Sequence, residues 1–216
     1  MFEQQNKVIW VINKIVDMVL LSVLWAVCSI PIVTIGASSA ALYHAINKAI
    51  REDKGYARQA FFQSFRENWK QCLGLGTVLL VFSGAFLGVI LFCASYSLGM
   101  FGQFYSVFSL ICLLLVVLLQ IHAYSLIGRF VLTNKQLFSV LVQLMGRNLL
   151  KNLMLLCLFA FAVEAVIFYP PLLLFIPAGY TFLVSVLEEP VFAKYIRVPH
   201  EEEEEEFSEE AGADQV

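Results

Sequence analysis

Hydrophobic residues occur along this chain in long continuous runs, separated by shorter segments that carry most of the charge. Four runs reach the roughly 17–25 residues that a helix needs to cross a bilayer core about 30 Å thick. They cover residues 18–35, 72–95, 106–128 and 152–168. A fifth run, 172–187, follows two prolines and makes only a short span, because a helix rises about 1.5 Å per residue. The pattern predicts an all-α, polytopic transmembrane helix bundle of about five spans.

The segments beside these runs have apolar residues at helical spacing and polar residues on the opposite face. This pattern occurs in residues 3–17, 40–51, 61–70 and 137–149. We expect amphipathic helices that lie in the headgroup layer, the last three of them on the cytoplasmic side. The same faces would also suit a docking surface for a partner. In 61–70 that surface would contain Phe61, Phe65, Asn68 and Trp69.

The lysines and arginines predict how the spans are oriented. Six lie between Lys48 and Lys70, four lie in 129–151, and none lies in 96–105. Cytoplasmic loops are enriched in these residues, so loops 36–71 and 129–151 are predicted to be cytoplasmic. With five spans, the C-terminal tail is then cytoplasmic as well. The N-terminus, with its amphipathic segment 3–17, is predicted to lie outside.

Composition agrees with a membrane protein. Hydrophobic residues make up 60% of the 216 residues and charged residues 14%, against about 45–50% and about 25% in soluble domains. The formal charge of −3 is misleading, because nine of the seventeen acidic residues lie in 199–216. Without that tail, fourteen basic residues against eight acidic ones give +6. We expect 199–216 to be a solvated, disordered tail.

The first apolar run continues into small residues without a polar loop. Pro31 removes a backbone donor near the end of the run, and we expect a kink there. The Thr34 hydroxyl is placed to satisfy a freed backbone group. From Gly36 to Ala41 the side chains are small enough for another helix to approach closely. The bend either serves packing alone or forms a helix-docking surface that meets a partner. The residues of this predicted kink and docking motif are Trp25, Pro31, Thr34, Gly36, Ala40 and Tyr43.

These residues also carry a resemblance to a known family. The stretch "LWAVCSIPIVTIGASSAALYHAI", followed by "REDKGY" and "FFQSFRENWKQ", is similar to the YesL family of bacterial integral membrane proteins, whose biochemical activity is unknown. The resemblance covers residues 15–73; over 74–198 only hydrophobicity and spacing agree. It rests on Trp25, Pro31, Thr34, Gly36, Ala40, Tyr43, Phe61, Phe65 and Asn68.

The resemblance implies a multi-pass protein of the bacterial cytoplasmic membrane. Members of the family are often encoded beside components of carbohydrate ABC transporters. It therefore suggests the permeases of such a transporter as partners, in addition to the lipid bilayer.

Two ionisable residues lie inside predicted spans. They are His122 and Glu164. Inserting a charged side chain near the centre of a membrane helix costs about 2.5–3.5 kcal/mol of free energy. We expect a neutral His122 that bonds to a neighbouring helix, with a proton relay as the alternative. Glu164 either reaches toward the outer headgroups or pairs inside the bundle. The two lie at different depths and make a poor acid–base pair.

Catalytic and metal-binding patterns are missing from the sequence. The five cysteines have no metal-ligand spacing, and no nucleophile, phosphate-binding or dinucleotide motif occurs. We therefore expect no enzyme, no metal and no cofactor, and the acidic tail disfavours nucleic-acid binding. The prediction is a non-catalytic accessory or regulatory partner of a carbohydrate ABC uptake system. The alternative is a small oligomeric transporter or channel.

Overall fold

The computed structural model describes residues 2–96 and 99–195, and every regular element within these ranges is helical. The prediction of an all-α protein is thus confirmed for the described residues, whereas the acidic tail 199–216 lies outside them. The longer helices are α1 (Phe2–Cys28), α2 (Ile35–Ala45), α3 (Ala57–Ser95), α4 (Gly99–Arg129), α5 (Asn134–Arg147), α6 (Leu149–Phe168) and α7 (Ile176–Tyr195). Three short helical segments connect them: η1 (Ile32–Thr34), η2 (Ile46–Arg51) and η3 (Pro170–Leu174).

Four described helices are long and apolar enough to cross a membrane. They are α3, α4, α6 and the part of α1 from Trp10 to Cys28. These helices indicate a membrane protein, as the sequence predicts. The predicted span 172–187 is divided between η3 (Pro170–Leu174) and α7, and neither is among these four described helices.

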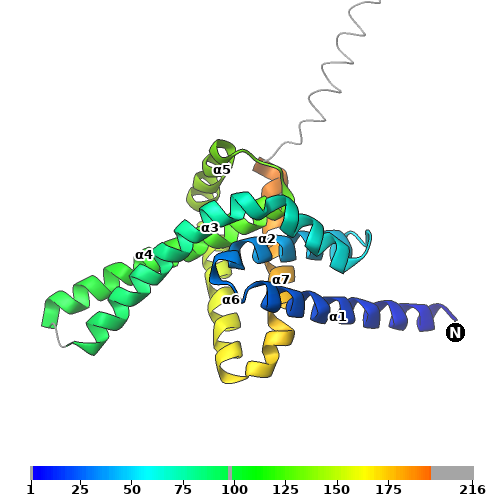
Figure 1. Cartoon of the computed structure of the whole chain (residues 1–216), viewed down its shortest axis with the longest axis horizontal. Coiled ribbons are helices and arrows are strands. Elements are labelled where there is room, and N and C mark those ends of the chain that lie inside the picture. The colour runs from blue at the N-terminus through cyan, green and yellow to red at the C-terminus, as the bar shows by residue number, and fades with distance from the viewer. Residues whose placement is uncertain (1, 97–98, 196–216) are drawn as a thin grey trace, which may run out of the picture.

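Two antiparallel hairpins extend from a packed centre in different directions (Figure 1). One consists of α3 and α4, and the other of α6 and α7. Helix α1 enters the centre from the side opposite the α3–α4 tip, and α2 lies at the centre. At about 1.5 Å per residue, the 39 residues of α3 extend about 58 Å, roughly twice a bilayer core. The first part of α3 packs beside α2, and the remainder pairs with α4 (Figure 1).

The predicted continuous helix 18–35 with a kink at Pro31 is wrong. Helix α1 ends at Cys28, and Pro31 precedes η1 in an extended conformation (φ −74°, ψ 115°). The residue before a proline is disfavoured in the helical region, so Ile30 favours an end to the helix. The Thr34 hydroxyl lies 2.5 Å from the Cys28 carbonyl oxygen and 2.6 Å from that of Pro31. It can thus satisfy a carbonyl at the turn.

After this turn, α2 runs back alongside α1. Near the turn, the hydroxyls of Ser29 and Ser38 form a hydrogen bond of 2.7 Å. The Trp25 indole N–H donates to the Ser39 hydroxyl at 3.1 Å. Further from the turn, Lys14 donates to the Ala49 carbonyl. Because residue numbers fall along α1 as they rise along α2, the two helices form an antiparallel hairpin.

The prediction for the N-terminal segment is also wrong. Residues 3–17 do not form a separate surface helix but continue directly into the apolar part of α1. Lys14 forms an ion pair with Asp53, in the loop predicted to be cytoplasmic. The N-terminal half of α1 and this loop therefore lie on the same side of the molecule, not on opposite sides of a membrane.

Segment 40–51 is not an interfacial helix either. Ala40, Ala41, Ala45 and Ile46 are fully buried, and the other residues from 42 to 50 are buried or half-buried, whereas Arg51 is exposed. Two of the polar residues that were expected to face solvent bond inward. The His44 Nδ1 donates to the Gly128 carbonyl at 2.9 Å, and Arg51 donates to the Ser185 carbonyl at 3.2 Å. Two residues of the polar face thus contact the backbones of α4 and α7, whereas Lys48 donates to Gln63 at the surface.

Glycines allow α2 to lie this deep. A Cβ on Gly36 would come 3.0 Å from Tyr124 Cε1 and 3.3 Å from the Cys72 carbonyl oxygen, and a Cβ on Gly76 would come 3.4 Å from Gly36 Cα. A Cβ on Gly128 would come 2.4 Å from the Ala40 carbonyl oxygen, which is too close for any side chain. Helices α2, α3 and α4 are therefore in backbone contact, as small residues permit.

We predict that Gly128→Ala destabilises the protein by about 3 kcal/mol or more, because α4 must move away from α2. The matched control is Gly84→Ala on α3, where an added Cβ meets nothing within 4 Å. That control is expected to be neutral or to stabilise by about 0.5–1 kcal/mol. Unfolding of the purified variants in detergent measures both effects. Equal stabilities for the two variants would contradict the close contact.

Candidate functional site

A polar cluster lies in the interior where α4, α6 and α7 meet. It consists of His122, Asn152 and Glu188, and all three side chains are buried. The Nδ1 of His122 is 2.7 Å from Glu188 Oε1, and its Nε2 is 3.1 Å from Asn152 Oδ1. His122 thus bonds to two neighbouring helices, where the sequence suggested one.

The hydrogen bonds of Asn152 fix the orientation of its amide group and thereby show that Nε2 of His122 carries a proton. Its amide nitrogen donates to the Met145 carbonyl at 2.9 Å, so its oxygen faces His122 and accepts from Nε2–H. The Nδ1 atom then either donates to an ionised Glu188 or accepts from a protonated one. In both cases one proton lies between the two residues, and the pair as a whole is neutral. Neutrality reduces the cost of burying it.

Glu164 takes no part in this cluster. It lies on an exposed part of α6, so it is not the partner of His122, as the difference in depth predicted. The residues that the sequence reading missed are Asn152 and Glu188. Glu188 follows directly after the apolar run that ends at Leu187, and the acidic pair in "LEEP" is the sequence signal that indicates it.

A second set of charges ties the loop after η2 to three helices. Arg129, at the end of α4, lies 2.7 Å from Glu52 and 3.4 Å from Glu189. The hydrogen bond from Arg129 holds the pKa of Glu52 below its ordinary value. The pKa of Asp53 is lowered in the same way, mainly by the hydrogen bond from Lys14 on α1. Both carboxylates therefore stay ionised at neutral pH. Asp53 pairs with Lys14 in the middle of α1, and Glu52 pairs with Arg129 at the end of α4, which also reaches Glu189 of α7.

The bend predicted as a helix-docking surface is only partly at the surface. Trp25 is half-buried against Ser39, whereas Gly36, Ala40 and Tyr43 are buried inside the chain. Gly36 lies against Cys72 of α3 and Tyr124 of α4, and Ala40 and Tyr43 lie against Gly128 of α4. The close packing of these three residues is therefore intramolecular.

The predicted cytoplasmic surface on the first turns of α3 is also divided. Phe61 is fully buried in a cluster with Leu42 and Ile46, so it is unavailable to a partner. Phe65 is partly buried between Phe61 and Trp69, at ring-centroid distances of 6.2 and 5.3 Å. Asn68 donates to Ser64 within the helix. Of the four residues, Trp69 is the most exposed, at 38%.

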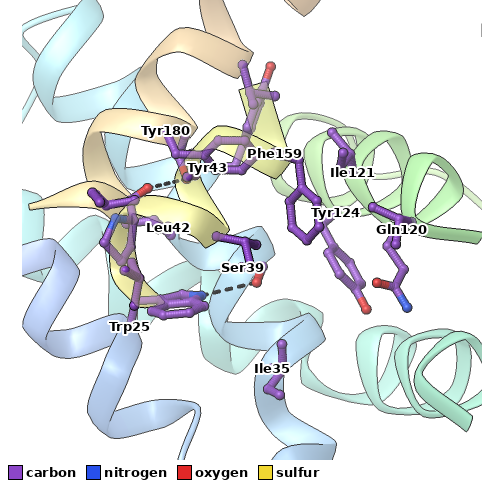
Figure 2. A pocket seen from close by; sticks show the side chains of 18 of the residues that line it. Trp25, Ile35, Ser39, Leu42, Tyr43, Gln120, Ile121, Tyr124, Phe159 and Tyr180 are labelled. Carbon is purple, nitrogen blue, oxygen red and sulfur yellow. Dashed lines mark hydrogen bonds between the residues drawn. The ribbon is translucent and has the colours of Figure 1, made fainter. Parts of the chain in front are cut away.

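A cavity of about 410 Å³ lies between α1, α2, α4, α6, η3 and α7. Figure 2 shows the Trp25 indole bonded to Ser39 on one side, and Tyr124 and Gln120 from α4 on another. Gln120 donates to Ser83 on α3 at 2.9 Å. The hydroxyls of Tyr43, Tyr124 and Tyr180 are buried without a hydrogen-bond partner in the described part of the chain. Because the walls come from so many segments, no local sequence pattern predicts the cavity.

Comparison with known proteins adds one result. Residues 18–90 match the family model described as "Protein of unknown function, DUF624". The match covers the apolar part of α1, the turn at Pro31, α2 and most of α3, which together contain the buried hairpin. No curated protein and no solved structure matches the chain.

We predict that His122→Leu destabilises the protein by about 3–5 kcal/mol, because it leaves the Glu188 carboxyl buried without its partner. Replacing both His122 and Glu188 by Leu is expected to cost less than His122→Leu alone. Glu164→Gln, a change at an exposed acid of the same region, serves as the control and is expected to shift stability by less than about 0.5 kcal/mol. Unfolding in detergent gives the three values. A double variant that costs as much as His122→Leu alone, or more, would contradict the coupling of the two residues.

Proposed function

We propose that the protein is a non-catalytic integral membrane protein that acts as an accessory or regulatory partner of a carbohydrate ABC uptake system in the bacterial cytoplasmic membrane. The resemblance of residues 15–73 to the YesL family suggests this kind of partner. The matched family model for residues 18–90 names no activity. The observation that carries the proposal is the α3–α4 hairpin.

The outer part of this hairpin extends well beyond the packed centre (Figure 1). Its side chains are largely apolar and exposed on both helices, with Val81 at 65% as an example. Gly84 and Gly88 lie one turn apart on α3, and an added Cβ at either position meets nothing within 4 Å. Small residues at this spacing let a second transmembrane helix approach closely. The hairpin therefore suits contact with another integral membrane protein.

The interior offers little support for the alternative, a small oligomeric transporter or channel. His122, Asn152 and Glu188 bond mainly to one another and to the backbone. The walls of the cavity are predominantly apolar and contain no charged residue in the part of the chain that the structure describes. A sugar or an ion needs many polar groups along its path. An accessory role requires no such path.

A photoreactive amino acid at Val81 tests the proposal in living cells of the native host. We predict a crosslink to a permease subunit of a carbohydrate ABC transporter, and reduced uptake of its sugar when the protein is deleted. The control position is Phe161 on α6, which is similarly exposed but lies on the other hairpin. It is expected to give no such crosslink. Crosslinks from Val81 to a second copy of this chain would favour the oligomeric alternative, and crosslinks to lipid alone would contradict the partner.

A further inference from the structure

The cavity opens on the side of a membrane-length helix. Its rim includes Val163 and Ile167 of α6, and Ile167 is 70% exposed. Leu173 of η3 adds a third exposed apolar side chain to the rim. Because α6 is one of the helices long and apolar enough to cross a membrane, the mouth of the cavity faces lipid. An occupant that enters through it comes from the bilayer.

The inner end of the cavity is deeply buried. Leu42 of α2 and Val184 of α7 lie there, and each is almost inaccessible. The cavity thus leads from an exposed apolar rim to a buried apolar end. Its volume of about 410 Å³ lies within the range of roughly 300–1,000 Å³ that is usual for sites that bind small molecules. Natural interiors seldom contain voids of this size.

The polar groups of the walls are mostly engaged with the protein itself. Trp25 bonds to Ser39, and the hydroxyls of Ser125 and Thr181 donate to carbonyls within their own helices. Among the described residues no charged side chain lines the cavity, so it does not suit a nucleotide or an ion. The hydroxyls of Tyr43, Tyr124 and Tyr180 have no hydrogen-bond partner among the described residues. The rest of the wall consists of aliphatic side chains and aromatic rings, which favours a mainly hydrocarbon occupant.

We propose that this cavity binds one acyl chain of a membrane phospholipid. The chain enters past Val163 and Ile167, its end lies near Leu42 and Val184, and the headgroup stays outside. The site is independent of the proposed partner, because the cavity belongs to the packed centre and not to the outer part of the α3–α4 hairpin. Binding there joins α2 to the α6–α7 hairpin through a shared ligand.

The test uses the full chain in vesicles of phosphatidylethanolamine and phosphatidylglycerol. A fraction of the phospholipid carries a diazirine at the end of one acyl chain, and labelled residues are identified by mass spectrometry after illumination. We expect labels at Leu42 and Val184, which lipid at the outer surface cannot reach, as well as on the exposed face of α3. Labels on α3 without any at Leu42 or Val184 would overturn the proposal.

A matched pair of variants tests the route. Ala162→Phe fills the cavity from α6, whereas Ala160→Phe adds the same volume at an exposed position outside the cavity. Labelling of Leu42 and Val184 is expected to fall at least about tenfold in the first variant and to stay unchanged in the second. Labelling of α3 should be equal in both. If Ala162→Phe leaves the inner labels unchanged, the label does not pass through this cavity and the assignment is wrong.

Discussion

The contact between the backbones of α2 and α4 at Gly128 is the constraint on which the rest of the structure depends. A Cβ there would come 2.4 Å from the Ala40 carbonyl oxygen, and glycines at 36 and 76 permit a similar approach of α2 to α3. In a bilayer, helices gain little from burying apolar surface, so close packing and interhelical hydrogen bonds must hold them together. The bond from His44 to the Gly128 carbonyl occurs at this same contact.

Other features follow from the central position of α2. Because α2 runs back along α1, the chain must turn sharply between Cys28 and Ile35, where Pro31 and Thr34 lie. The glycine contacts fix one side of α2 against α3 and α4. The opposite side faces α6 and α7 across the apolar cavity. On α4, the side chains of Tyr124 and His122 then serve two different sites: Tyr124 lines the cavity, and His122 joins α4 to α6 and α7.

The sequence predicts the helical class and most of the long apolar helices, because runs of this length have few other stable structures in a membrane. It fails for segment 40–51, whose polar residues at helical spacing are typical of an interfacial helix. Periodicity shows that one face is polar but not whether that face meets water or other backbones. His44 and Arg51 in fact bond to carbonyls of distant helices.

The interior sites were predictable only in part. His122 stands out as an ionisable residue in a long apolar run, but its partners lie 30 and 66 residues away and depend on the packing of two other helices. The small residues from Gly36 to Ala41 correctly indicate a close helix contact. The tertiary fold decides whether this contact lies within the chain or with a partner. In the structure, the small residues from Gly36 to Ala41 pack against α3 and α4 of the same chain.

A cysteine scan over residues 40–49, in a chain whose native cysteines are replaced, tests the central position of α2 most directly. Each variant is treated in the membrane with a water-soluble maleimide and in parallel with a lipid-soluble one, before and after unfolding. Burial predicts that cysteines at Ala41 and Ala45 react with neither reagent until the protein unfolds. A stripe of rapidly reacting positions at helical spacing, including Asn47, would show instead that this segment lies on the membrane surface, and would contradict the account.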